Sequence, residues 1–191
     1  MRARDNPFSV ERVHAIRFRP QGTTFAGMTA RLKALNYRAA IVGPDGSGKT
    51  TLLEDLQRAF IQENIKARMV FVNDTSPLSD PACRRLLSEL TRDEFLLLDG
   101  ADLIPRSAWS LLKRHTISHA YGLVITSHRP GLLPTLIECT TSLTLLQDIA
   151  GELNPSDRPI PVESLDALFY RHRGNLRDCL RELYDLCAQS D

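Results

Sequence analysis

The residues with the most specific chemistry lie in one glycine-rich segment. Residues 43–50 read GPDGSGKT and match the pattern G-x-x-x-x-G-K-[ST] in full. Glycines let a backbone curl so that successive N–H groups point at phosphate oxygens, and the dipole of a following helix strengthens this attraction. We expect Lys49 to reach the β- and γ-phosphates of a nucleoside triphosphate, and the Thr50 hydroxyl to bind magnesium. The predicted phosphate-binding residues are Gly43, Pro44, Asp45, Gly46, Ser47, Gly48, Lys49, Thr50 and Thr51.

A carboxylate that can complete the magnesium shell follows an apolar run. Asp99 closes the run Phe95-Leu96-Leu97-Leu98. A strand that is apolar on both faces is typical of a buried parallel sheet, and it delivers its last residue to the carboxyl edge, where ligands bind. The sequence therefore predicts Thr50 and Asp99 as the metal ligands, with ATP and Mg²⁺ as the bound species.

The residue after this aspartate departs from a common pattern. Many ATPases place a glutamate there to polarise the attacking water, whereas this chain has Gly100. Asp102 lies two residues further along and is a candidate base if its loop bends it inward. Orienting the water is a large share of this catalysis, so without such a base we expect slow hydrolysis.

The elements that must position these residues alternate between strands and helices. We predict strands at 38–43, 67–73, 95–100, 122–128 and 142–147, and helices at 23–36, 49–62, 82–91, 106–119, 162–171 and 175–188. Residues 1–22 are predicted to be irregular, 129–138 a loop with at most a short helix, and 154–161 a linker-like stretch. Such alternation implies a parallel sheet covered on both faces.

The predicted fold class is therefore α/β, a three-layer nucleotide-binding fold with a five-stranded parallel sheet and a small C-terminal helical lid. We divide the chain into an N-terminal basic arm (1–24), a core that carries the phosphate-binding loop (25–152) and a helical lid (153–191).

Composition limits the classes of partner. The 24 basic and 23 acidic residues give a net charge of +1, which provides no strong general attraction to nucleic acid or anionic lipid. Arginines near the N-terminus are the one local basic feature: Arg2, Arg4, Arg12, Arg17 and Arg19. The four cysteines lack zinc spacing and read as reduced thiols of a cytoplasmic protein. No apolar run is long enough to span a bilayer.

The fourth predicted strand and the start of the last helix carry a resemblance. The strand ends in Thr126-Ser127-His128, and RPGLLPTLIE (129–138) follows it. Gly174-Asn175-Leu176-Arg177 opens the last helix and resembles the sensor 2 motif of AAA+ ATPases. Over about residues 25–190, the chain is similar to compact AAA+ relatives of the origin-recognition, secretion and transposition ATPase kind.

This resemblance implies roles for further residues. It implies that GPDGSGKT is a Walker A motif, that Asp99 ends a Walker B strand, and that an additional strand lies between those two strands. It implies that Ser127 or His128 senses the γ-phosphate and that Arg177 reaches over the phosphates from the lid. The candidate catalytic residues are Lys49, Asp99, Asp102, Ser127, His128 and Arg177.

The resemblance also bears on the adenine pocket and the partners. It implies that residues just before the core contact the base, with Phe8 and Val10 as candidates. It further implies a protein partner or self-association, whereas only the N-terminal arginines support nucleic acid.

Departures from the AAA+ pattern keep three functions open. Glu138 and Cys139 occupy the region where an arginine finger is usual, Gly100 replaces the Walker B glutamate, and the predicted lid has two helices. These features favour a slow ATPase or nucleotide-dependent switch over a ring-forming motor.

A nucleoside monophosphate-type kinase is the first alternative, because GPDGSGKTT resembles the loop of thymidylate kinases. Against it, the Asp-Arg pair that those kinases carry after a later strand is not found. A non-catalytic nucleotide-binding module is the second alternative, which Gly100 supports. ATP is expected over GTP because the sequence has no Asn-Lys-x-Asp signature.

Overall fold

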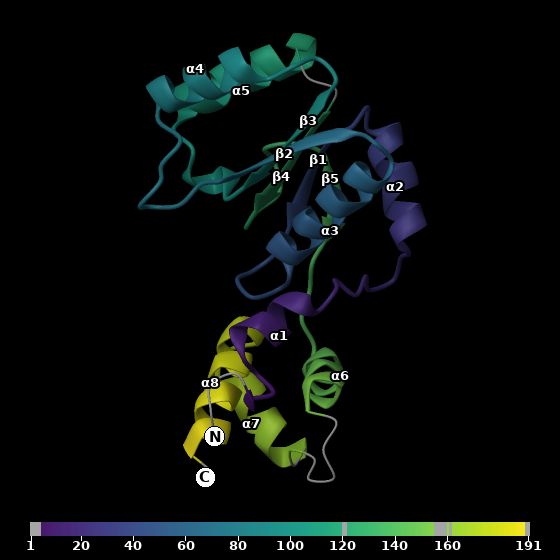
Figure 1. Ribbon diagram of the computed structural model, residues 1–191, viewed down its shortest axis with the longest axis vertical. Helices are drawn as coiled ribbons and strands as arrows, with labels where there is room; N and C mark the ends of the chain where they lie inside the picture. The colour runs from purple at the N-terminus through teal and green to yellow at the C-terminus, as the bar shows by residue number, and fades with distance from the viewer. Residues whose placement is uncertain (1–4, 120–121, 155–159, 161, 190–191) are drawn as a thin grey trace. The chain divides into compact units, whose positions relative to one another are not determined.

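The computed structural model describes residues 5–119, 122–154, 160 and 162–189 (Figure 1). Contacts group the chain into two compact units, which are described separately. Met1–Arg19, Pro44–Gly48 and Thr140–Asp191 make up the first unit, and Pro20–Gly43 with Lys49–Cys139 make up the second. The domain bounds at residues 24 and 152 stay a prediction.

The second unit is built on one parallel sheet of five strands. Its strands are β1 (Arg38–Val42), β2 (Lys66–Phe71), β3 (Glu94–Asp99), β4 (Gly122–Ser127) and β5 (Thr135–Glu138). Their order across the sheet is β2-β3-β4-β1-β5, so β4 lies between the strand that precedes the loop and the strand that ends in Asp99. The predicted fold class is confirmed.

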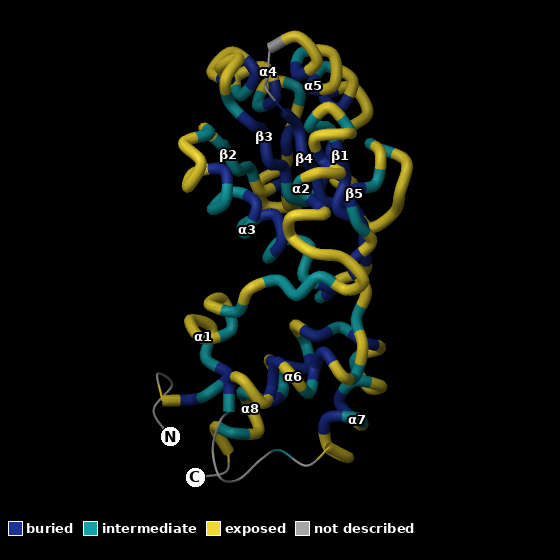
Figure 2. The backbone as a smooth tube through the Cα atoms, turned by 90° about the vertical axis from the view of Figure 1, so that its right-hand side faces the viewer, coloured by how far each residue is buried: buried dark blue, intermediate teal, exposed yellow. Residues whose placement is uncertain are grey.

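Helices cover both faces of this sheet. α4 (Asp80–Glu89) and α5 (Arg106–His119) pack on the face that presents Leu96 and Leu98. On the opposite face, Phe60 of α3 (Lys49–Gln62) stacks on Phe95 with ring centroids 4.3 Å apart. α2 (Phe25–Ala34) lies beside β5, and η2 (Ala101–Leu103) follows β3. The central strands are therefore buried, as Figure 2 shows.

The predicted fifth strand was wrong. Residues 142–147 begin the helix α6 (Leu143–Leu153), whereas the strand lies at Thr135–Glu138, within the segment predicted as a loop. The Ser142 hydroxyl caps the helix by accepting a hydrogen bond from Leu145 N at 3.1 Å. The apolar run continues to Leu153, and its buried positions follow helical spacing. A six-residue window was too short to distinguish the two periods.

The first unit is helical and includes α1 (Val10–Ala15), α6, α7 (Val162–Arg171) and α8 (Leu176–Gln189). Its helical part therefore includes α6 as well as the two predicted lid helices. Its core residues are Phe8, Leu145, Leu146, Ile149, Ala150, Leu153, Leu165, Leu168, Leu176, Cys179, Leu180 and Leu183. Most of the predicted linker at 154–161 lies outside the described residues.

The N-terminal segment is packed, although it was predicted to be irregular. Residues 10–15 form α1, the Asn6 side chain donates to Tyr184 O at 2.8 Å, and Phe8 is only 2% exposed. The side chain of Arg19 pairs with Glu152. Arg2 and Arg4 of the predicted basic arm lie outside the described residues. The described part of this segment therefore contributes to the core of the first unit.

Of the helices in the described residues, none has the length and apolar character required to cross a membrane.

Packing of the N-terminal segment can be tested with two substitutions. Phe8→Ala should lower the free energy of unfolding by ~3–5 kcal/mol, because it removes a buried aromatic side chain. Val10→Ala is the control, because Val10 is 72% exposed and should change stability by less than ~0.5 kcal/mol. Urea unfolding followed by circular dichroism measures both. Equal effects of the two substitutions would contradict the packing described.

Candidate phosphate and metal site

The glycine-rich loop joins the end of β1 to the start of α3. Gly43 N donates to Ser127 O at 3.1 Å, which extends the pairing of β1 with β4 by one residue. The Lys49 ammonium donates to Gly43 O at 2.8 Å, and the buried Ser47 hydroxyl donates to Pro44 O at 2.8 Å. These bonds hold the loop at both ends.

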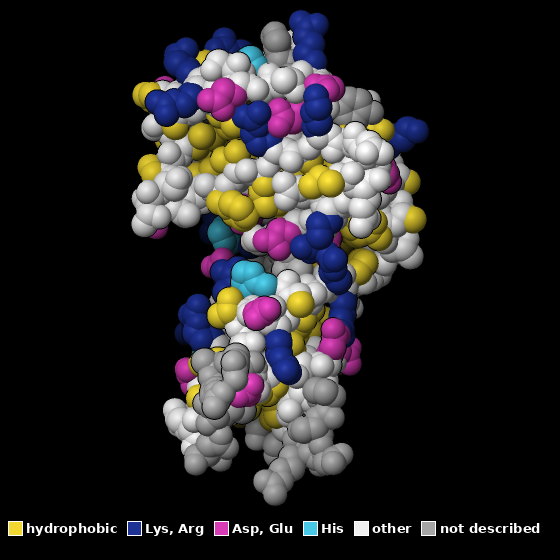
Figure 3. Space-filling view, viewed as in Figure 1, with side chains coloured by type: hydrophobic (Ala, Val, Ile, Leu, Met, Phe, Trp, Pro, Cys, Tyr) yellow, Lys and Arg dark blue, Asp and Glu magenta, His cyan; other side chains and the backbone are white. Residues whose placement is uncertain are grey.

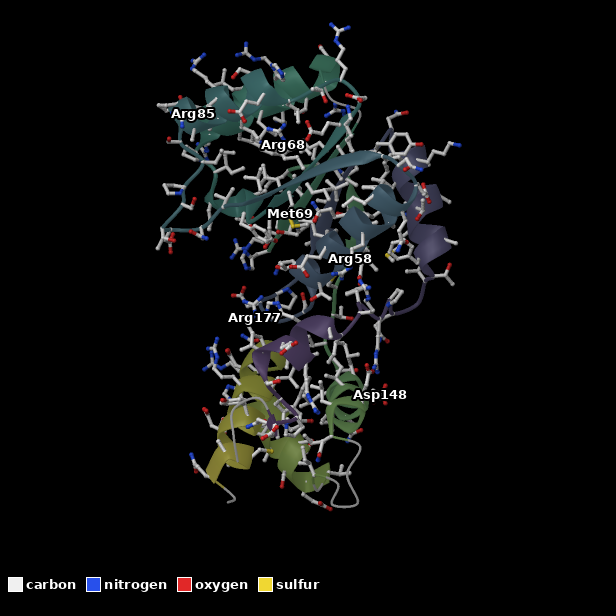
Figure 4. All side chains as sticks on the ribbon, viewed as in Figure 1. Arg58, Arg68, Met69, Arg85, Asp148 and Arg177 are labelled. Carbon is white, nitrogen blue, oxygen red and sulfur yellow. The ribbon has the colours of Figure 1, made fainter. Side chains whose placement is uncertain are left out.

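Within the first unit, the same loop packs on the first turn of α8. Gly46 has φ +71°, and a Cβ added there would overlap the side-chain oxygen of Asn175 and lie 2.9 Å from Leu176 N. Asn175 in turn caps the helix, since its side-chain oxygen accepts from Asp178 N at 3.3 Å, and its amide nitrogen donates to Asp178 Oδ2 at 2.7 Å. Only glycine fits at position 46. Arg177 lies in this turn of α8, labelled in Figure 4, and is exposed.

The carboxylate of Asp99 is held by two hydroxyl groups in the second unit. Thr50 Oγ1, from the first turn of α3, donates to Asp99 Oδ2 at 2.9 Å. Thr126 Oγ1, from β4, donates to Asp99 Oδ1 at 2.5 Å and accepts from Gly100 N at 2.9 Å. The structure thus brings together the two predicted metal ligands, Thr50 and Asp99. Their oxygen atoms are hard donors of the kind that Mg²⁺ prefers.

Thr126 was missed by the sequence analysis. It is 1% exposed and sits one residue before the predicted sensor pair. The register pairs Leu98 with Ile125, so the next residues, Asp99 and Thr126, reach the sheet edge at the same level. Knowledge that β3 and β4 are adjacent and in this register would have identified it.

The predicted sensor residues have different surroundings. Ser127 is buried, and its hydroxyl donates to Arg129 O at 2.8 Å. Asp102 Oδ2 accepts from His128 N at 2.6 Å and lies 2.9 Å from His128 Nδ1. Because a carboxylate accepts, Nδ1 is the protonated ring nitrogen in this contact. Asp102 therefore fixes the orientation of the imidazole at the end of β4.

Gly100 has a backbone that excludes other residues. Its φ and ψ are +84° and +39°, in the left-handed region. A Cβ added there would overlap the backbone oxygen of Val72. Val72 is held beside the end of β3 because its backbone N donates to Asp99 O at 2.9 Å. A glutamate at this position would require the backbone to shift.

Cys139 also lies close to the loop lysine. Its backbone N donates to Val42 O at 2.7 Å. Burial raises the pKa of its thiol to about 12, and the charge of Lys49 opposes this only in part. The thiol stays protonated near neutral pH and is not a nucleophile there.

The strand order and the loop after β1 define the class of fold. The chain has the fold of the AAA+ P-loop ATPases. It is similar to a variant of RuvB from Thermotoga maritima, with a TM-score of 0.60 and 19% identity over 86% of this chain and 60% of that one. It is also similar to NtrX from Brucella abortus, solved in complex with ATP, with a TM-score of 0.56 and 16% identity over 93% of this chain and 52% of that one.

The chain thus spans about 60% of the length of RuvB. No protein-family model and no curated protein matches its sequence.

The close approach at Gly100 can be tested against a matched glycine. Gly22 has φ +69° with nothing within 4 Å of an added Cβ, so Gly22→Ala measures backbone strain alone, ~1–2 kcal/mol. Gly100→Ala should cost ~1–3 kcal/mol more, because it adds the overlap with Val72 O. Urea unfolding gives both values. Equal losses would show that the Val72 contact does not constrain this position.

Proposed function

We propose that this chain binds ATP with Mg²⁺ and acts as a slow ATPase or nucleotide-dependent switch on a macromolecular partner. The observation that carries this proposal is the Asp99 carboxylate, held between the hydroxyls of Thr126 and of Thr50, the residue that follows the loop lysine in the chain. A packing role alone does not account for a lysine, a threonine and a carboxylate gathered at the carboxyl edge of a parallel sheet.

The loop residues supply the binding energy in this proposal. Backbone N–H groups of residues 45–50 surround the phosphates, and the N-terminus of α3 adds its dipole. Lys49 exchanges its bond to Gly43 O for phosphate oxygens. Thr50 and Asp99 hold Mg²⁺, which when bound neutralises charge on the β- and γ-phosphates.

His128 is proposed to orient the attacking water or to contact the γ-phosphate. Asp102 was a candidate base, but its Oδ2 is engaged by both His128 N and Nδ1, which favours a positioning role. Since Gly100 cannot be replaced by a glutamate without moving Val72, the usual water-polarising group is excluded by the backbone. This geometry supports slow turnover.

Arg177 and α8 are proposed to report the state of the nucleotide. The first turn of α8 contacts Gly46 of the loop, so a loop that closes on phosphates changes the surroundings of Asn175 and Arg177. A ligand shifts a conformational equilibrium only when it contacts the two states differently, and this contact supplies such a difference. Arg177 reaches the phosphates in this proposal, by its resemblance to sensor 2.

The structural neighbours support the ligand and the kind of partner. NtrX was solved in complex with ATP, and another RuvB structure is described as a Holliday junction branch migration motor. For this chain, which spans only part of either protein, a macromolecular partner or self-association is a proposal. All four cysteines occur as free thiols, which supports the cytoplasmic location expected from the sequence.

Loss of the loop lysine should remove most of the ATP affinity. Lys49→Ala should weaken binding of MgATP about 10- to 100-fold, because charge-assisted hydrogen bonds contribute ~1.5–3 kcal/mol each. Equilibrium dialysis with labelled ATP measures it, and Lys33→Ala, an exposed lysine of α2, is the control. Wild-type affinity in Lys49→Ala would refute the proposed site.

The roles of His128 and Asp102 can be separated from binding. His128→Ala and Asp102→Asn should each slow release of γ-labelled phosphate by about 10-fold or more, with ATP affinity nearly unchanged. Asp74→Asn, an exposed acid in a loop, is the control. Equal rates in all three variants would exclude both residues from turnover.

The same assay, run with nucleoside monophosphates present, distinguishes the alternatives. Label transferred to a diphosphate would identify a kinase and overturn the proposal. Label that stays on bound ATP would identify a non-catalytic binding module.

A further inference from the structure

The outer faces of α4 and α5 carry cations that have no acidic partner. Among the described residues, five such exposed side chains form no ion pair. They are Arg84 and Arg85 of α4, with Arg106, Lys113 and Arg114 of α5, and together they are named the α4–α5 basic face. The Lys113 ammonium lies 5.6 Å from the centroid of the Trp109 ring.

Nearby acidic groups compensate only part of this charge. α5 contains no Asp or Glu in its sequence. Asp93 pairs with Lys66 at 2.7 Å, and Glu89 and Glu94 both pair with Arg68, at 3.3 and 2.9 Å. Asp80 accepts from the neutral Ser107 hydroxyl at 2.7 Å and keeps its negative charge. The five cations therefore outnumber the neighbouring carboxylates that lack a cation of their own, which leaves a local excess of positive charge, although the net charge of the chain is only +1.

The packing of the two helices places these cations on one surface. Cys83 Sγ lies 3.5 Å from Ala108 O, and the Asp80–Ser107 bond joins the first turns. The apolar sides of both helices face the sheet, so their charged sides point outward. Figure 3 shows Lys and Arg side chains over α4 and α5, with Asp and Glu side chains between them, and Figure 4 labels Arg85 there.

The basic face is large enough to contact several phosphates of a nucleic-acid backbone. From Arg106 to Arg114 it extends about 12 Å along α5, and packed helices lie about 8–10 Å apart. A nucleic-acid duplex presents about one negative charge every 1.7 Å of its axis. Several phosphates can therefore meet these cations at once, and four of the five are arginines, whose guanidinium binds phosphate through two parallel hydrogen bonds.

We propose that the α4–α5 basic face binds the phosphate backbone of double-helical nucleic acid. The surface lacks the apolar area that a protein partner or a membrane would require. A stable protein interface has an apolar core, and a membrane-bound helix inserts an apolar face. In the described residues of α4 and α5, Ile117 is the one large apolar side chain with high exposure, at 69%. Backbone binding needs no apolar contact, and it reads no sequence.

The α4–α5 basic face is not the basic region that the sequence indicated. The N-terminal arginines were the only local basic feature recognised there. Arg19 is paired with Glu152, so its charge is compensated. The cations of the basic face are separated by a strand in the sequence and gather only through the packing of α4 on α5.

The test measures binding of the full chain to a short fluorescein-labelled duplex DNA of arbitrary sequence, by anisotropy without ATP. A variant with Arg84→Gln, Arg85→Gln and Arg114→Gln is compared with a control carrying Arg12→Gln, Lys33→Gln and Arg173→Gln. The control side chains are exposed and form no ion pair in the described structure, so both variants lose three charges. Circular dichroism verifies that both fold.

The basic-face variant should bind about 10-fold or more weakly at low salt, and the salt slope, d log K/d log[salt], should fall by about 2–3. The control should stay within about threefold of wild type, and replacing the same three arginines with lysine should preserve most of the slope. Equal weakening in both variants, or no wild-type binding at about 50 mM salt, would overturn the proposal. Binding to phosphatidylserine vesicles or to an acidic peptide but not to the duplex would also overturn it.

Discussion

Two hydroxyl groups hold the carboxylate of Asp99 at the carboxyl edge of the sheet. This contact depends on how the second unit places α3 and β4 relative to β3. Thr50 is in place because the loop ends where α3 begins, and Thr126 is in place because β4 lies directly beside β3. Buried apolar strands on both sides fix the level at which the three side chains meet. The two hydroxyl donors orient this carboxylate, and carboxylate and hydroxyl oxygens are hard donors of the kind that Mg²⁺ prefers.

The residue after Asp99 constrains the backbone beside this carboxylate. Gly100 adopts a left-handed conformation and passes against Val72 O, so the backbone between β3 and η2 has no space for a side chain. The same turn delivers Asp102 to His128. In the proposed function, this imidazole held by a carboxylate takes the place of the glutamate that many ATPases carry after the aspartate. This arrangement is consistent with the slow turnover that we propose.

Local patterns predicted the parts of the structure that depend on local physics. The loop is recognisable from the residues of GPDGSGKT alone. The apolar runs at β1, β3 and β4 identify buried strands even when their neighbours in the sheet are unknown. The failures depend on long-range contacts. Phe8 is buried by helices more than a hundred residues away, and Thr126 was recognisable only from the register of β3 and β4. The segment at 142–147 was misassigned because its helical period becomes visible only over twice that length.

The most direct test of the central claim is electron paramagnetic resonance of Mn²⁺, which replaces Mg²⁺ at oxygen sites. The account predicts that the wild-type chain binds Mn²⁺ together with ATP, and that Asp99→Asn removes most of this binding while Asp74→Asn does not. Equal binding of Mn²⁺ and ATP by Asp99→Asn and the wild type would contradict the assignment of Asp99 as a metal ligand, and with it the proposed site.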